Sequence, residues 1–136
     1  MLPSARGGEE AVVVGIGIDL IEVARVRRSL ERWGDRLVRK LMDPEEASLL
    51  PEELSRRAEA VALAITGKEA ASKAIGTGWS RGVRWRDVVV KREPTTEVKL
   101  LARAGEFAQR LGSDGSNRAR LELRDGVAVG EVWLLA

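Results

Sequence analysis

The segment 65–78 places charged side chains at helical spacing directly before two glycines. On a helix, Glu69 and Lys73 lie one turn apart on the same face, so a carboxylate and an ammonium group project into one volume. Gly76 and Gly78 then permit positive φ angles, which end the helix and let the backbone approach a ligand closely. This spacing is compatible with a site for a metal-bound phosphate. A surface ion pair followed by a helix C-cap would give the same spacing.

A second acidic residue lies near the end of an apolar run close to the N-terminus. Asp19 is the one charged residue in segment 12–21, which otherwise has the composition of a buried strand. A buried carboxylate needs a partner, a hydrogen bond or a metal, although Asp19 could instead cap the helix that follows. Two carboxylates and one lysine, Asp19 with Glu69 and Lys73, indicate a hard cation such as Mg²⁺ that is shared with phosphate oxygens.

The helix expected after this strand carries a basic ridge. Apolar side chains recur there at the spacing of one helix face, at Val23, Val26, Leu30 and Trp33. Arg25, Arg28 and Arg32 lie at positions i, i+3 and i+7, away from that face. Such a ridge suits an acidic partner helix, and a merely solvated helix face is the alternative.

The remaining segments predict a mixture of helices and strands. Asp43 followed by Pro44 has the composition of a helix start, and a long helix is expected over 52–75. Gly67 either weakens this helix or marks close packing. The other expected elements are a strand at 88–90, a short strand leading into a helix over 98–111, a polar loop at 112–117, and hairpin arms at 118–124 and 127–135 around Asp125-Gly126. The fold class is therefore α+β, with a mainly antiparallel sheet packed against a long helix.

Composition narrows the chemistry. The chain has 136 residues with no cysteine and no histidine, so thiolate, Ser-His-Asp and the usual zinc chemistry are excluded. A net charge of +2 and few aromatic residues argue against a nucleic-acid protein, although a basic interaction module stays an alternative. No segment has the length of a membrane helix and the polar start is unlike a signal peptide, so we expect a cytoplasmic protein. Residues 1–10 are expected to be a flexible segment and 11–136 a single domain.

Two motifs are specific when they occur together. The first spans 15–25 (GIGIDLIEVAR), and the second spans 67–78 (GKEAASKAIGTG). The first motif alone would be weak evidence, and it is not a dinucleotide fingerprint because the third glycine is missing. Together they resemble holo-(acyl carrier protein) synthase, the small bacterial-type branch of the 4'-phosphopantetheinyl transferases. The resemblance extends over most of the chain, from about residue 12 to residue 135.

The resemblance implies a reaction: transfer of 4'-phosphopantetheine from coenzyme A to a serine of apo acyl carrier protein, with release of adenosine 3',5'-bisphosphate. It implies a role in fatty acid biosynthesis. Mg²⁺ would be bound by Asp19 and Glu69, and Lys73 would neutralise developing charge on the same oxygens. Proton removal from the serine would fall to Glu69 or to a water held by the metal.

The resemblance also assigns binding residues. Lys68 would contact other phosphates of coenzyme A, whose pocket would be lined by Gly76, Thr77 and Gly78. The acidic helix of acyl carrier protein would dock on the basic ridge of Arg25, Arg28 and Arg32, where Arg25 matches the partner-binding arginine of the family. Members of this size are typically homotrimers with each active site at a subunit interface.

This chain departs from the family pattern at three places. Ala64 and Ile65 stand where the family has an Arg-Phe pair, and a Gly-Lys-Pro is absent near 93–96. A third motif, which contains histidine in the family, is replaced by 123–126, where Arg124 could substitute for a lost phosphate contact. The metal and lysine positions are retained, which favours an active transferase. The alternative is a catalytically silent relative that binds acyl carrier protein or coenzyme A.

Overall fold

The computed structural model of the chain describes residues 4–5 and 9–136. The two shortest strands, β1 (Ser4–Ala5) and β2 (Glu9–Glu10), pair with each other in antiparallel fashion near the N-terminus. The rest of the predicted segment 1–10 lies outside the described residues. Within the described part of the chain, no helix combines the length and the apolar character needed to cross a membrane.

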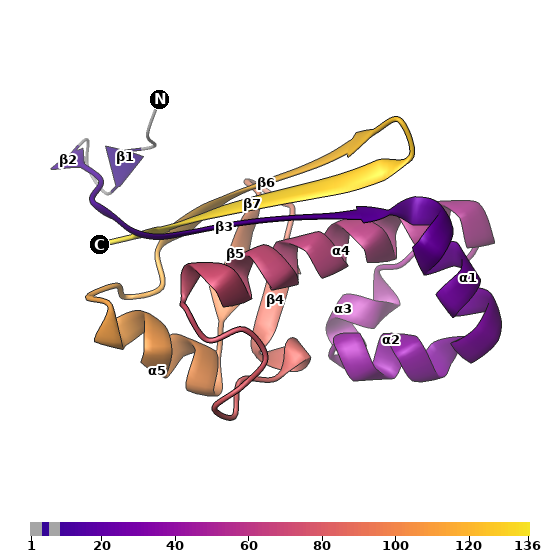
Figure 1. Cartoon of the computed structure of the whole chain (residues 1–136), viewed down its shortest axis with the longest axis horizontal. Helices are drawn as coiled ribbons and strands as arrows, with labels where there is room; N and C mark the ends of the chain where they lie inside the picture. The colour runs from indigo at the N-terminus through magenta and orange to yellow at the C-terminus, as the bar shows by residue number, and fades with distance from the viewer. Residues whose placement is uncertain (1–3, 6–8) are drawn as a thin grey trace.

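The main sheet has three antiparallel strands in the order β3-β7-β6 (Figure 1). They are β3 (Val13–Glu22), β7 (Val127–Leu135) and β6 (Asn117–Arg124). The β6–β7 turn has positive φ at both central residues, 50° at Asp125 and 78° at Gly126, as a two-residue hairpin of type I′ requires. The predicted hairpin is therefore confirmed.

Helix α4 (Leu54–Ala74) packs across one face of this sheet, and it confirms the long helix predicted over 52–75 (Figure 1). Glycines allow the close approach. A Cβ atom on Gly17 would lie 1.7 Å from the carbonyl oxygen of Ala70, and one on Gly15 would lie 2.0 Å from that of Ala74. A Cβ on Gly67 would come within 3.0 Å of Val90, so this residue marks close packing. The contact fixes β3 directly beside the second half of α4.

Three short helices surround the N-terminal half of α4 and cover a first core. They are α1 (Val23–Trp33), α2 (Asp35–Leu41) and α3 (Pro44–Ser48). Asp43 caps α3, as predicted, because its side chain accepts a hydrogen bond of 2.7 Å from the backbone N–H of Glu46. The buried side chains of this core include Val26, Leu30 and Val61.

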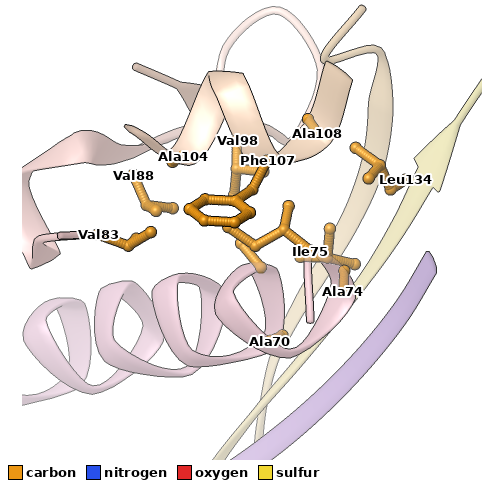
Figure 2. Close-up of a cluster of buried hydrophobic side chains, with 12 residues drawn as sticks. Ala70, Ala74, Ile75, Val83, Val88, Val98, Ala104, Phe107, Ala108 and Leu134 are labelled. Carbon is orange, nitrogen blue, oxygen red and sulfur yellow. The ribbon is translucent and has the colours of Figure 1, made fainter. Parts of the chain in front are cut away.

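A second core lies at the other end of α4. It is enclosed by the 3-10 helix η2 (Trp85–Asp87), strands β4 (Val88–Lys91) and β5 (Glu97–Leu100), and helix α5 (Ala102–Arg110). Figure 2 shows the Phe107 ring of α5 packed among Val83, Val88 and Val98 above Ile75. The mixture of an antiparallel sheet and a long helix confirms the predicted α+β class.

Strand β3 differs from its prediction in one respect. The uninterrupted apolar run predicted a strand buried on both faces, yet only the face with Gly17 lies against α4. On the opposite face Ile16, Ile18 and Leu20 are 55%, 54% and 63% exposed. The prediction of a buried strand is therefore wrong for the single chain, and one face of the sheet presents apolar side chains outward.

Candidate active site

A pocket of about 380 Å³ lies where β3, α1 and α4 meet. Three of the residues predicted from the sequence line it, one from each element: Asp19, Arg25 and Glu69. Apolar side chains, including Leu20 and Ile65, form other parts of its wall. The pocket therefore combines two carboxylates, one guanidinium group and an apolar surface.

The Asp19 carboxylate on β3 is paired with the Lys73 ammonium on α4. The Lys73 ammonium donates hydrogen bonds to the Asp19 carboxylate at 3.1 Å and to the carbonyl oxygen of Ile18 at 2.9 Å. The Lys73 side chain remains 50% exposed and that of Asp19 21% exposed. The alternative in which Asp19 caps the following helix is wrong, because the N-cap of α1 is Glu22 and no side chain caps it.

The glycines of β3 explain why these groups meet. Gly15 and Gly17 bring the strand against α4 at Ala74 and Ala70, so the next inward-facing residue, Asp19, lies beside the preceding turn of the helix. On α4, Glu69 and Lys73 are one helical turn apart. Two sequence motifs that are distant along the chain thus form one site.

The donor set suits a hard cation that is shared with a ligand. In residues 4–5 and 9–136, no group of three or more acidic, histidine or cysteine side chains is placed to hold a metal ion. Asp19 and Glu69 supply two carboxylates to the pocket, and Mg²⁺ is typically bound through one or two carboxylates together with waters and phosphate oxygens. The residues present therefore fit Mg²⁺ bound together with a phosphate compound.

Lys68 does not line this pocket, and the prediction that it contacts a phosphate of the coenzyme is wrong for this chain. Its side chain is fully buried, and its ammonium donates to Glu46 Oε1 at 3.0 Å, to the Trp85 carbonyl at 3.2 Å and to the Val88 carbonyl. Burial lowers the pKa of Lys68 and raises that of Glu46. With all three donor positions occupied inside the protein, Lys68 is not available to a nucleotide.

The sequence did not indicate Glu46 as a partner of Lys68. The two residues are 22 positions apart and belong to different helices, so no local spacing relates them. The second oxygen of Glu46 accepts a hydrogen bond of 3.3 Å from the Val90 backbone N–H. This buried pair ties α3 and β4 to the turn of α4 that carries Glu69.

The glycine-containing stretch after α4 ends the helix with positive φ angles, as predicted. Gly76 and Gly78 have φ angles of 81° and 56°, and no atom lies within 4 Å of a Cβ built on either residue. The backbone N–H groups of Thr77 and Gly78 both donate to the carbonyl oxygen of Ser72, at 3.2 and 3.1 Å. These three loop residues do not line the pocket that contains Asp19 and Glu69.

The basic ridge of α1 is exposed along its length. Arg25, Arg28 and Arg32 are all exposed, and Arg25 also lines the acidic pocket. The Arg32 guanidinium lies 4.8 Å from the centre of the Trp33 ring. The sequence pattern did not indicate Arg36 of α2, which approaches the same ring at 5.7 Å and extends the basic surface.

The sheet, the long helix and the pocket define an α+β protein with a pocket lined by two carboxylates and an arginine. Residues 15–125 match the sequence model of the 4'-phosphopantetheinyl transferase superfamily. The holo-[acyl-carrier-protein] synthase of Solibacter usitatus is 41% identical over 103 residues, which cover 74% of this chain and 82% of that protein. The chain therefore belongs to the 4'-phosphopantetheinyl transferase superfamily.

Solved structures show the same fold. The holo-[acyl-carrier-protein] synthase of Neisseria meningitidis superimposes with a TM-score of 0.76 at 20% identity, over 90% of this chain and 98% of that one. The holo-(acyl-carrier-protein) synthase of Bacillus anthracis, described as a complex with CoA (3',5'-ADP), gives a TM-score of 0.68 at 25% identity, over 91% and 97% of the two chains.

Proposed function

We propose that this protein is a holo-(acyl carrier protein) synthase. It transfers 4'-phosphopantetheine from coenzyme A to a serine of apo acyl carrier protein. The observation that carries the proposal is the pocket in which Asp19 and Glu69 meet Arg25, with Lys73 hydrogen-bonded to Asp19. The reactions named for its relatives agree with this assignment.

The reaction exchanges one phosphorus–oxygen bond for another. The serine oxygen attacks the phosphorus that carries the pantetheine arm, the bond to the bridging oxygen breaks, and adenosine 3',5'-bisphosphate leaves. Mg²⁺ held by Asp19 and Glu69 would offset charge on the diphosphate oxygens. The half-exposed Lys73 ammonium lies beside Asp19, where it stabilises the negative charge that develops on the same oxygens.

The serine proton needs an acceptor near the carboxylates. With no histidine in the chain, the candidates in this pocket are the Glu69 carboxylate and a water held beside it. Both arrangements put Glu69 next to the attacking oxygen. A Glu69 variant therefore tests the two roles of this residue together.

The basic ridge on α1 is the proposed docking site for acyl carrier protein. The ridge consists of three exposed arginines, Arg25, Arg28 and Arg32. Their positive charges are complementary to those of an acidic helix. Since Arg25 also lines the pocket, a carrier helix bound on the ridge would deliver its serine to the carboxylates. The pocket and the ridge thus form one continuous surface.

A homotrimer is the proposed assembly, and the cytoplasm is the proposed location. The outward apolar face of β3, with Ile16, Ile18 and Leu20 more than half exposed, favours contact with another copy of the chain. The loop 76–78 lies outside the pocket lining of its own chain, so a subunit interface offers a way for it to reach a shared ligand.

One observation favours a second candidate function. Arg124 stands in place of the histidine-containing motif, and its guanidinium lies 3.5 Å from the Glu122 carboxylate on the same strand. Because Arg124 is paired with a carboxylate of its own strand, it does not obviously replace the lost motif, and this favours a catalytically silent relative. Such a relative would bind coenzyme A or acyl carrier protein without transfer. Incubation with both substrates separates the two functions, because only a transferase adds the phosphopantetheine mass to the carrier protein.

A further inference from the structure

Two tryptophans connect the loop after α4 to the corner before β4. The Trp79 and Trp85 rings stack with their centres 4.0 Å apart and their planes at 20°. Trp79 directly follows the loop 76–78, and Trp85 begins η2. Stacked aromatic pairs stabilise beyond the area they bury, so this contact relates the position of the loop to that of η2.

The Trp85 end of the stack is firmly anchored. The Trp85 carbonyl accepts a hydrogen bond of 3.2 Å from the buried Lys68 ammonium. Asp87 Oδ2 accepts from the Arg84 backbone N–H at 3.0 Å, which fixes the single turn of η2. Because Lys68 directly precedes Glu69 on α4, the anchor of the stack belongs to the same helix as the active site.

The Trp79 end is held differently. Its indole Nε1 is buried, and it is the one buried side-chain nitrogen or oxygen without a hydrogen-bond partner in the described part of the chain. Buried polar groups normally have a hydrogen-bond partner, and this indole N–H has none, so no hydrogen bond holds the ring in place. The indole packs against the second core and stacks on Trp85, and these ring contacts hold it next to the loop.

We propose that Trp79 and Trp85 are positioning residues for the loop 76–78, and that their stack thereby tunes the affinity for coenzyme A. The inference rests on the proposed function, in which Thr77 and its two flanking glycines contact the coenzyme. The loop backbone is held by hydrogen bonds to Ser72, to the Lys73 carbonyl and to the Ser80 hydroxyl, but its two glycines have no side chains that could pack. The stack adds a side-chain contact at the end of the loop, so less conformational freedom is left to be lost when the coenzyme binds.

The test compares Trp79→Leu with Trp79→Phe. Leucine keeps apolar volume but removes the stack, so the KM for coenzyme A should rise by about three- to tenfold while kcat and the KM for acyl carrier protein stay unchanged. Phenylalanine keeps an aromatic ring and removes the unpaired N–H, so its KM should stay within about twofold of wild type. Equal KM values for coenzyme A in wild type and Trp79→Leu would overturn the proposal.

A ligand-free measurement separates this inference from the proposed function. Hydrogen exchange of the Thr77 and Gly78 amides, which donate to Ser72, should accelerate in Trp79→Leu and not in Trp79→Phe. Unaccelerated exchange refutes the stack as a positioning device, whether or not the wild type transfers phosphopantetheine. If Trp79→Leu does not fold, Trp85→Leu removes the same stack from its other side and is judged by the same two readouts.

Discussion

The Lys73 ammonium on α4 donates a hydrogen bond of 3.1 Å to the Asp19 carboxylate on β3, across 54 positions of sequence. The same ammonium binds the carbonyl oxygen of the neighbouring Ile18. Lysine is therefore held against the strand that supplies one of the two pocket carboxylates. The charged groups of the two sequence motifs, Asp19 of the first and Lys73 of the second, are thus brought together within the single chain, without a ligand.

Replacing either pocket carboxylate should abolish transfer without unfolding the protein. In Glu69→Gln and Asp19→Asn the amide keeps the side-chain volume but loses the negative charge that would hold Mg²⁺, so we expect the rate to fall more than about 100-fold. Transfer rates and melting temperatures would be measured together. Glu59→Gln is the matched control, since Glu59 is an exposed residue of the same helix. Wild-type turnover in Glu69→Gln would refute the assignment of the site.

Charge reversal on the ridge should weaken the use of acyl carrier protein far more than the binding of coenzyme A. In Arg25→Glu the KM for acyl carrier protein should rise at least about tenfold, because a repulsive contact replaces an attractive one, and coenzyme A binding should change little. Arg110→Glu, on α5 at the opposite end of the molecule from α1, controls for overall charge (Figure 1). An equal loss of affinity for both substrates would show that Arg25 supports the structure of the pocket instead.

The buried pair of Lys68 and Glu46 predicts a stability effect that depends on its partner. Lys68→Met should destabilise the fold by about 3–5 kcal/mol, because it leaves the Glu46 carboxylate buried without its cation. The double variant Lys68→Met, Glu46→Gln should recover part of this loss, since no charge is then left uncompensated. Urea unfolding of the three proteins measures both quantities. A double variant less stable than Lys68→Met would contradict this account of the pair.

The same variant should show a defined pH dependence. Burial raises the pKa of Glu46 above its ordinary value of 4.5, and Lys68 partly opposes that shift. Without Lys68 the folded protein binds the Glu46 proton more tightly than the unfolded chain does, so stability falls as pH rises above 4.5. The loss in Lys68→Met should therefore be larger near neutral pH than near pH 4.5. A loss that is equal at both values would indicate that Glu46 is not the affected group.

The outward face of β3 should decide the oligomeric state. Ile18→Glu places a charge in the middle of this apolar face, and it should convert the proposed trimer to monomers when molar mass is measured by light scattering. Leu49→Glu is the control, because Leu49 is 82% exposed and lies outside the sheet. A molar mass of one chain for the wild-type protein would contradict the proposed trimer.

Sequence patterns predicted the elements that local rules control. The Asp43 cap, the Asp125-Gly126 turn and the long helix all follow from short-range preferences of their residues, and the structure has them. No local rule predicts the meeting of Asp19 with Lys73. It was indicated by the need of a carboxylate in an apolar strand for a partner and by the family resemblance, which assigns both residues to one site.

Long-range placement accounts for the errors. Lys68 has the charge and the position in the motif of a phosphate ligand, but its orientation depends on Glu46 of another helix, which no spacing reveals. Similarly, an apolar run predicts burial, but it does not indicate whether the same chain or another copy buries it. In the single chain, the outer face of β3 stays exposed although its residues are apolar.

The most direct test is intact-protein mass spectrometry of apo acyl carrier protein incubated with this protein and coenzyme A, with Mg²⁺ or with a chelator. We expect the carrier protein to gain one phosphopantetheine mass, in a reaction that requires Mg²⁺ and is lost in Asp19→Asn. No gain with any of several carrier proteins, under conditions where the wild type is folded, would contradict the transferase assignment and favour the silent relative.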